Sequence, residues 1–365
     1  MIVLDSHCDT PSQVVRLRDL GQDNRLAHID FPKLKAGKVD ACFFALYTSQ
    51  SKPRQEALPY VWKMLEKSKE AVEKCPYATL ATSTAEVYEN KAKGLISILF
   101  GMENGNPVGE SVSELVRLYD AGVRYVTLTH NGDNQIADSA SQGTTWNGLS
   151  PFGEGFVAKM NELGMIVDLA HASDKTFYDC LSASSTPIVS THSCCRALAS
   201  HRRNMDDKML RALADKGGVI QINFYPAFLS DDFNKAFSAN PLSDEADRVE
   251  EEFIADPANA EKRQAWDNIQ EKLLALDRPS YKRVVDHIDH AVNVAGVESV
   301  GLGSDFDGIV VPPAGLENAS KMGVIFEEMR RRGYTDDAIE KIAGKNFLRV
   351  FSDVEKAAKQ GQKAG

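Results

Sequence analysis

The sequence predicts an α/β fold in which one domain, residues 1–365, forms a (β/α)₈ TIM-like barrel. Eight short apolar runs of strand character recur along the chain, and helical patterns separate most of them. Histidines and acidic residues directly follow many of these runs. No GxGxxG or GxxxxGK[ST] motif follows any run, so an open nucleotide-binding sheet would lack its phosphate loop. The strand count and the missing loop together favour the barrel.

Length and charge limit the class of protein. With 365 residues, 43% of them hydrophobic, the chain can bury a sizeable core. Its formal charge of −10, with no basic block, argues against nucleic acid or an anionic membrane as the main partner. The opening MIVLDSHCDTP lacks the basic and apolar regions of a signal peptide. We therefore expect a soluble, cytoplasmic protein.

The first half of the chain contains four predicted strands, three of which lead into ionisable side chains. His7 and Asp9 follow the first strand two residues apart, so an extended backbone would aim both to one side. Glu103 follows the third strand in GMENGNP, and His130 follows the fourth in THNGDNQ. The second strand is apolar throughout, as a strand buried on both faces requires. These strands are expected at residues 2–5, 39–47, 95–100 and 123–129.

The second half continues with two tandem strand–helix units. The runs MIVDLA and PIVS each end within two residues of a histidine, His171 and His192, which places both imidazoles on one rim of a parallel sheet. The following SHRRN adds a cation near the pair, either Arg202 or Arg203. Asp305 is the first acid beyond the last strand, in GSDFDG. These strands are expected at residues 165–170, 187–190, 218–224 and 300–303.

Helical patterns account for much of the remaining chain. Residues 229–279 are rich in acids and lack a strong apolar period, so we interpret them as an inserted helical excursion on the catalytic rim. His287 and His290 fall on a helix and are assigned to structure. Helices are expected at residues 53–74, 84–92, 111–120, 281–295, 321–332, 335–343 and 346–359.

The spacing of the six cysteines matches no recognised motif. They show no CxxC spacing, so neither a zinc knuckle nor a thioredoxin-like motif is predicted. We expect them to be buried as small apolar side chains. The adjacent Cys194 and Cys195 could alternatively ligate a metal or be redox-active.

The polar residues that follow the strands form a set suited to a pair of divalent transition-metal ions. Imidazole and carboxylate groups are the ligands of zinc. If Glu103 bridges, two metals would lie ~3.5–4 Å apart and share a hydroxide whose pKa falls toward ~7. Any single histidine is more simply a satisfied core or capping residue, but the set as a whole favours metal binding. The set comprises His7, Asp9, Glu103, His130, His171, His192 and Asp305.

The sequence resembles the membrane (renal) dipeptidase family of zinc metallopeptidases, within the amidohydrolase-type barrels. The resemblance covers most of the chain and implies a (β/α)₈ barrel with two zinc ions per chain that hydrolyses dipeptides. By family analogy it also implies a homodimer. The motifs that carry it, in chain order, are HCDTP, GMENG, RYVTLTHNGDNQIADS, GLSPFGEGFVAKMNELGMIVDLAHAS, STHS, SHRRNMDD, VIQINFY and GLGSDFDG.

The resemblance implies a ligand set for the two zinc ions. His7 and Asp9 would hold one ion, and His171 and His192 would hold the other. Glu103 would bridge both.

The resemblance implies roles for three further residues. His130 would polarise the scissile carbonyl and steady the oxyanion, and Asp305 would carry a proton from the bridging hydroxide to the leaving amine. Arg203 would pair with the free C-terminal carboxylate of the dipeptide, to which a planar guanidinium is suited. Arg202 is the weaker candidate for binding this carboxylate.

Several alternatives stay open at the level of sequence. L,L- and L,D-dipeptides are both candidate substrates, because residues 229–279 are longer than the resemblance predicts and lie where substrate would be covered. Cobalt or manganese would fit the same ligands as zinc. A related amidohydrolase acting on another small amide or an ester is the second function considered. A catalytically silent scaffold barrel is the third, but it predicts a missing ligand, and none is missing.

Overall fold

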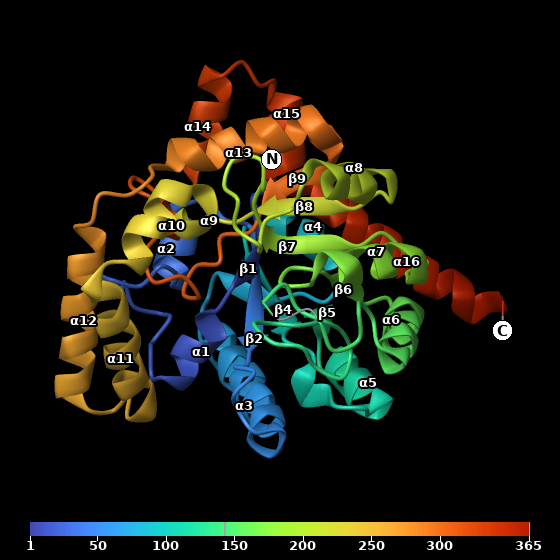
Figure 1. The fold of residues 1–365 in the computed structure, drawn as a ribbon, viewed down its shortest axis with the longest axis horizontal. Coiled ribbons are helices and arrows are strands. Elements are labelled where there is room, and N and C mark those ends of the chain that lie inside the picture. The colour runs from blue at the N-terminus through green and yellow to red at the C-terminus, as the bar shows by residue number, and fades with distance from the viewer. Residues whose placement is uncertain (142–143, 365) are drawn as a thin grey trace.

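The structure is a computed structural model that describes residues 1–141 and 144–364. The described residues contain nine parallel strands in one sheet, eight of which follow the order β1-β2-β4-β5-β6-β7-β8-β9 in a nearly closed barrel (Figure 1). This confirms the predicted (β/α)₈ fold class. The strands are β1 (Leu4–Cys8), β2 (Ala41–Tyr47), β3 (Ala78–Leu80), β4 (Ile96–Glu103), β5 (Val123–Thr127), β6 (Ile166–Asp168), β7 (Val189–Ser193), β8 (Val219–Ile222) and β9 (Val300–Leu302).

Backbone hydrogen bonds join the two ends of the barrel sheet. The N–H of Asp9 donates to the carbonyl of Phe306 at 2.9 Å, and the N–H of Asp305 donates to the carbonyl of His7 at 3.0 Å. The segment after the last barrel strand is therefore held against the end of the first. These two hydrogen bonds bring His7 and Asp9, from the start of the sequence, next to Asp305, from near its end.

Predicted and observed strands differ mainly at their carboxyl ends. β4 extends to Glu103 and β7 extends past His192, so both side chains belong to strands and not to the loops after them. β3 is not predicted, because three residues are too short to show a period. It pairs only with β4, outside the barrel order.

Helices surround the barrel, and several begin at a serine whose side chain accepts an N–H of the first turn, as Ser83, Ser111, Ser150 and Ser173 do. α1 and α2 are not predicted, since six residues give less than two turns of periodicity. The helices are α1 (Thr10–Val15), α2 (Phe31–Ala36), α3 (Arg54–Glu73), α4 (Thr84–Ala92), α5 (Val112–Asp120), α6 (Pro151–Leu163), α7 (Asp174–Ala183), α8 (Asp207–Asp215), α9 (Pro226–Leu229), α10 (Asp231–Ser238), α11 (Pro241–Ala255), α12 (Ala260–Leu274), α13 (Tyr281–Ala295), α14 (Gly323–Arg331), α15 (Asp336–Glu340) and α16 (Asn346–Ala364), with short turns at Asn106–Val108, Val297–Ser299, Ala319–Lys321 and Lys341–Lys345.

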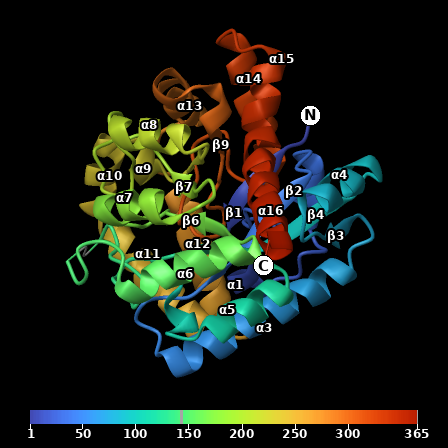
Figure 2. The ribbon, with the colours of Figure 1, turned by 90° about the vertical axis from the view of Figure 1, so that its right-hand side faces the viewer.

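The amino-terminal end of the barrel is closed by α16. Figure 2 shows this helix running lengthwise along the molecule, and it contacts β8 and β9. The first residues of several strands, among them Leu4, Ala41 and Val219, share one buried cluster with Phe347 and Phe351 of α16. Burial of these aromatic side chains makes this end an apolar core, which leaves the opposite end free to carry polar groups.

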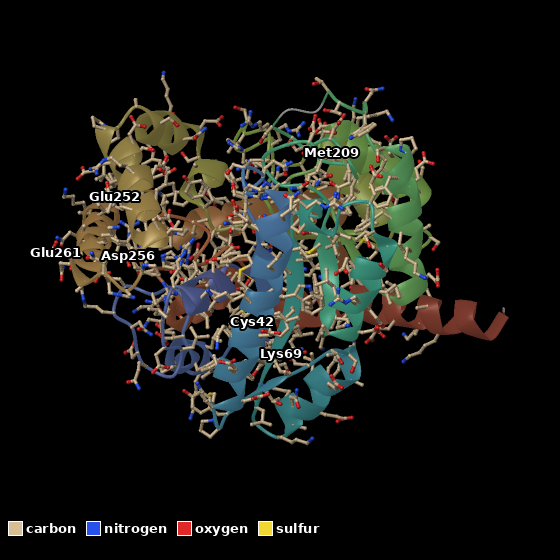
Figure 3. The ribbon with its side chains drawn as sticks, turned by 90° about the horizontal axis from the view of Figure 1, so that it is seen from below. Cys42, Lys69, Met209, Glu252, Asp256 and Glu261 are labelled. Carbon is tan, nitrogen blue, oxygen red and sulfur yellow. The ribbon has the colours of Figure 1, made fainter. Side chains whose placement is uncertain are left out.

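Residues 229–279 contain α10, α11 and α12, which pack around a hydrophobic cluster of their own. Phe233, Phe237, Phe253 and Trp266 are buried in this cluster. Figure 1 shows α11 and α12 side by side at the edge of the molecule, and Figure 3 shows Glu252, Asp256 and Glu261 at the same edge. In the part of the chain that the structure describes, no helix has the length and apolar character needed to cross a bilayer.

Candidate metal centre

Irregular strand pairing sets the direction of His7 and His192. The register between β1 and β2 shifts in the segment that contains His7, and that between β7 and β8 shifts in the segment that contains His192. Such bulges interrupt the alternation of a strand and re-aim a side chain. The two imidazole rings consequently face each other inside the barrel mouth, with centroids 3.8 Å apart.

Glu103 lies at the centre of the polar cluster, and its two carboxylate oxygens face different partners. Oε2 lies 3.6 Å from His7 Nε2, whose other neighbour is Asp9 Oδ2 at 3.5 Å. Oε1 lies 3.0 Å from His171 Nε2 and 3.5 Å from His192 Nε2. The structure thus brings together all five residues predicted as metal ligands. Asp9 is the residue directly before α1. Its side chain therefore enters the group from the start of a helix and not from an extended strand.

A buried hydrogen-bonded chain orients His192. Thr191 Oγ1 donates to Asp168 Oδ2 at 2.7 Å and lies 2.9 Å from His192 Nδ1. Because the single hydroxyl hydrogen is used on Asp168, the contact to the imidazole requires Nδ1 to carry the proton. Nε2 is then the atom with a free lone pair, and it is the one that faces Glu103.

The other two histidines have equivalent supports. His171 Nδ1 lies 3.2 Å from the amide oxygen of Asn131, and His7 Nδ1 lies 2.9 Å from the hydroxyl of Tyr125. The amide oxygen of Asn131 can only accept, so His171 Nδ1 carries the proton, whereas the hydroxyl of Tyr125 can donate or accept and orients the His7 ring without deciding its tautomer. All three histidines therefore direct Nε2 toward the carboxylate of Glu103.

The charges and unsatisfied atoms of this cluster fit metal ions. His7 Nε2, His192 Nε2 and Asp9 Oδ1 are buried without a hydrogen-bond partner among the described residues. Burial and the nearby Glu103 raise the pKa of Asp9 well above its ordinary value. Burial also opposes ionisation of Glu103, but the imidazoles around it outweigh that effect and hold its pKa below the ordinary value. Divalent cations would offset the repulsion between these carboxylates and complete the orphaned atoms.

His130 lies at the edge of the same cluster. Its Nε2 is 3.9 Å from Glu103 Oε1, and its ring stands 4.2 Å from that of His171. Together these three residues form one of the groups close enough to hold an ion. Burial lowers the pKa of His130 to about 4, so the imidazole is neutral at pH 7. A neutral imidazole can donate one N–H bond to a substrate oxygen or ligate a metal.

Asp305 reaches the cluster from beyond β9. Its carboxylate lies within 4.8 Å of ligand atoms of His7 and Asp9. Asn223 Nδ2 donates to its Oδ2 at 2.9 Å, and no described residue donates to Oδ1. The backbone of Asp305 has φ +59°, a conformation that non-glycine residues adopt rarely and that is enriched at functional sites. Gly308 leaves the necessary room, since a Cβ there would come within 2.1 Å of Asp9 Oδ2.

Arg203 is a buried cation with spare hydrogen-bonding capacity. Its Nη2 donates to the carbonyl of His192 at 3.3 Å, while its Nε is buried without a partner among the described residues. Burial lowers its pKa to about 10, so the guanidinium stays charged at pH 7. Arg202 is more exposed and contacts only the carbonyl of Ser141 at 3.5 Å among the described residues.

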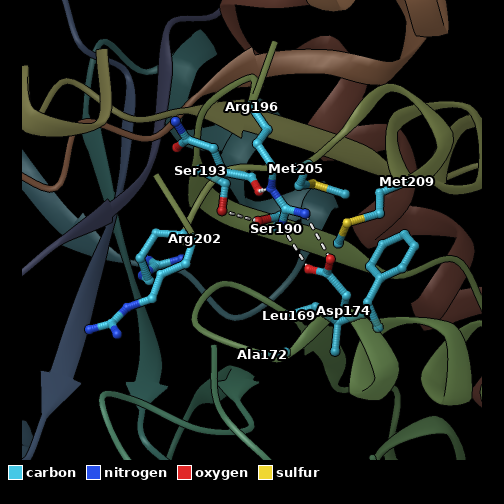
Figure 4. Close-up of a pocket in the computed structure, with 12 residues that line it drawn as sticks. Leu169, Ala172, Asp174, Ser190, Ser193, Arg196, Arg202, Met205 and Met209 are labelled. Atoms are coloured by element: carbon cyan, nitrogen blue, oxygen red, sulfur yellow. Dashed lines mark hydrogen bonds and ion pairs between the residues drawn. The ribbon is translucent and has the colours of Figure 1, made fainter. Parts of the chain in front are cut away.

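The pocket beside these arginines is too small for a dipeptide. Figure 4 shows Arg202 at its edge, the ion pair between Arg196 and Asp174, and the hydrogen bond between Ser190 and Ser193. Its volume of about 10 Å³ is close to the minimum for a single water. This pocket is therefore not a candidate for binding a dipeptide.

Sequence reasoning misses the residues that support the site. Asp168 is the acid within the apolar run MIVDLA, and a buried acid in a strand is a signal that could have identified it. Tyr125 and Asn131 give no such signal, because tyrosine and asparagine are ordinary in a strand and a loop. Of the predicted ligand set, the structure separates none of the residues from the cluster.

Histidines and carboxylates gathered at the carboxyl ends of barrel strands lie where such barrels carry their active sites, and they are suitable ligands for divalent metal ions. A family model described as membrane dipeptidase, peptidase family M19, matches residues 1–365. The chain belongs to this metallopeptidase family and is a dipeptidase, which confirms the resemblance seen in the sequence. Membership in a metallopeptidase family implies bound metal ions.

One curated relative and two solved structures are similar to this chain. The dipeptidase aclJ of Aspergillus oryzae is 31% identical over 358 residues, which cover 95% of this chain and 75% of that protein. The probable dipeptidase PvdM of Pseudomonas aeruginosa superposes with a TM-score of 0.82 at 26% identity, covering 98% of this chain and 96% of that one. A metallo peptidase from Rhodobacter sphaeroides, liganded with a phosphinate mimic of L-Ala-D-Ala, gives a TM-score of 0.80 at 21% identity over 97% and 99% of the two chains.

Proposed function

We propose that the protein is a binuclear zinc dipeptidase that hydrolyses dipeptides bearing a free C-terminal carboxylate. The observation that carries this proposal is the position of Glu103, whose two oxygens face separate sets of ligands. A carboxylate placed in this way can bridge two cations without moving. His7 and Asp9 would hold one zinc ion on the Oε2 side, and His171 and His192 would hold the other.

The second pair of ligands is His171 and His192, on the Oε1 side of Glu103. When bound, two zinc ions would lower the pKa of a shared water toward ~7 and supply a bridging hydroxide as nucleophile. The protein contributes by holding each imidazole at Nδ1, which keeps every Nε2 directed inward. Cobalt or manganese would satisfy the same ligands, so the choice of zinc rests on the donor types.

His130 and Asp305 are proposed to manage charge and proton during hydrolysis. His130 is neutral and sits beside His171, where its N–H can donate to the scissile carbonyl oxygen as negative charge develops on it. Asp305 can take a proton at Oδ1, because Asn223 occupies only Oδ2. It would then deliver that proton to the leaving amine.

Arg203 is proposed to bind the substrate carboxylate. A buried guanidinium with an unpartnered Nε offers the donor that a carboxylate requires, and it stands next to His192. L,L- and L,D-dipeptides both present this carboxylate. The phosphinate mimic of L-Ala-D-Ala bound by the Rhodobacter sphaeroides metallo peptidase supports including D-residues at the second position.

The proposal also includes the inserted segment, the cytoplasmic location and the homodimer. Residues 229–279 would form an insertion within the single domain that helps to cover the rim, which is supported by the ion pair between Glu250 of α11 and Arg16 beside α1. A cytoplasmic homodimer is expected from the sequence and from the family. Sedimentation of the purified protein measures the dimer directly.

Metal content and turnover test the proposed function together. We expect two zinc ions per chain in wild type and turnover of both L,L- and L,D-dipeptides that disappears after chelation. Asp305→Asn should keep the metal but lose turnover, whereas Arg203→Gln should impair only substrates with a free carboxylate. Equal rates for metal-free and metal-loaded protein would overturn the proposal.

A further inference from the structure

A second cavity, lined by none of the residues of the metal cluster, lies between residues 13–27 and the pair of helices α11 and α12. Its volume is about 210 Å³. Four of its lining residues are arginines, although the chain as a whole has a formal charge of −10. Three of them come from the N-terminal segment and the fourth comes from α12. They are Arg16, Arg18, Arg25 and Arg263.

The arginines of this cavity retain hydrogen-bonding capacity. Arg16 Nη1 lies 3.4 Å from Glu250, and its Nε is buried without a partner among the described residues. Arg263 donates through one nitrogen to the carbonyls of Arg16 and Pro257, at 3.3 and 2.9 Å. A guanidinium carries five N–H donors, so these contacts leave donors for a ligand.

The other two arginines each have one carboxylate partner. Arg18 lies 2.7 Å from Asp307, and Arg25 lies 2.6 Å from Glu271. Asp267 is the one acid among the described lining residues. A carboxylate has two oxygens and a guanidinium has five N–H donors, so one carboxylate partner leaves each of these arginines with further donors.

The remaining walls are apolar or neutral. Trp266 and Phe253 are buried, and the guanidinium of Arg263 lies 5.2 Å from the ring centroid of Phe253. Leu26 and Ala27 face the cavity from the N-terminal segment. A bare inorganic ion would leave these apolar walls and most of the volume uncovered, whereas a short carbon skeleton would cover them.

We propose that this cavity is a second binding site, separate from the metal centre, for a small organic anion with acidic groups at both ends. One acidic group would bind Arg16 and its neighbours on the N-terminal segment, and the other would bind Arg263 on α12. The ligand would thereby join two segments that are far apart in sequence. Its occupancy would stabilise the docking of α11 and α12 against the N-terminal segment.

Calorimetric titration of the metal-loaded protein with succinate tests this site, with inorganic phosphate as the comparison anion. We expect one succinate per chain, bound more tightly than phosphate, and a rise in Tm with succinate concentration. Arg263→Gln should weaken succinate at least ~10-fold, equivalent to about 1.4 kcal/mol. Arg248→Gln is the matched control, because Arg248 lies on the neighbouring helix and does not line the cavity; it should bind succinate like wild type.

Two further variants separate this site from the metal centre and from effects on folding. Gln270→Trp should fill the cavity and abolish binding while all four arginines remain. Arg203→Gln should leave succinate binding unchanged, because Arg203 belongs to the metal centre. Binding that survives Arg263→Gln but vanishes in Arg203→Gln would overturn the proposal, as would the absence of binding or phosphate binding as tight as that of succinate.

Discussion

The two ends of the barrel use the same strands for opposite purposes. At the amino-terminal end, Leu4, Ala41 and Phe351 belong to one buried apolar cluster. At the carboxyl end, His7 and His192 present buried nitrogens that no described residue satisfies. Buried polar atoms without partners cost stability. The apolar end therefore stabilises the fold, while the polar end keeps buried atoms without partners that metal ions can bind.

Removal of the central carboxylate should give the largest effect and test the polar end. Glu103→Gln should lower kcat/KM by ~10³-fold or more, since a metal ion supplies several kcal/mol of transition-state stabilisation and 1.36 kcal/mol is tenfold. The metal-free variant should unfold at a lower temperature than metal-free wild type, because the imidazoles that hold the pKa of Glu103 below its ordinary value lose their buried carboxylate partner. Peptidase assays and thermal unfolding measure both effects, with the exposed Glu89→Gln as control.

A substitution that creates a cavity at the amino-terminal end should have the opposite balance of effects, with a large loss of stability and no loss of turnover. Phe351→Ala should destabilise the protein by ~3–5 kcal/mol, the usual cost of truncating a buried phenylalanine. Turnover per folded, metal-loaded molecule should stay at the wild-type value. Denaturant unfolding and active-site-normalised kinetics report the two quantities. A loss of turnover larger than the unfolded fraction would show that the two ends are not independent.

Tyr125 links the two ends and should show an intermediate behaviour. Its ring packs 5.4 Å from Phe43 in the apolar cluster, and its hydroxyl contacts His7 Nδ1. Tyr125→Phe should weaken metal affinity ~10–100-fold, as the loss of an outer hydrogen bond does, while stability changes by only ~1 kcal/mol. Competition with a chelator measures the affinity. Tyr334→Phe, which removes a hydroxyl bonded to Asp289 far from the metal, should leave that affinity unchanged.

A buried histidine outside the polar cluster should give the smallest effect, visible only through pH. His287 Nδ1 accepts from the N–H of Cys195 at 3.0 Å, and Nε2 faces the carbonyl of Leu229 at 3.1 Å. Burial lowers its pKa to about 4, below the ordinary 6.5. The unfolded chain therefore binds more protons as pH falls from 6.5 toward 4, and the native state loses stability over that window.

The measurement for His287 is denaturant unfolding at pH 7.5 and pH 5. Between these values wild type should lose about 2 kcal/mol more than His287→Gln, because each unit below the ordinary pKa is worth ~1.4 kcal/mol. Equal losses in the two proteins would show that His287 is not held neutral.

The strands and the gathering of the polar residues could be predicted from the sequence because they depend on local order. Apolar runs predict strands, and residues after parallel strands must meet at one rim. The bulges at His7 and His192 could not be predicted, since a register shift depends on the partner strand. The same limit applies to Asn223, which acts through a hydrogen bond to Asp305, 82 positions further along the chain.

The cavity between the N-terminal segment and α12 also lies beyond sequence reasoning. Its arginines are scattered over positions 16 to 263, and no spacing connects them. Only the docking of α11 and α12 brings Arg263 to the carbonyl of Arg16. Tertiary packing, not local pattern, creates that site.

Anomalous scattering from zinc-loaded crystals would show whether Glu103 bridges two metal ions. We predict two peaks, one beside His7 and Asp9 and the other beside His171 and His192, with the carboxylate of Glu103 between them. A single peak, or two peaks of which one makes no contact with Glu103, would contradict the account.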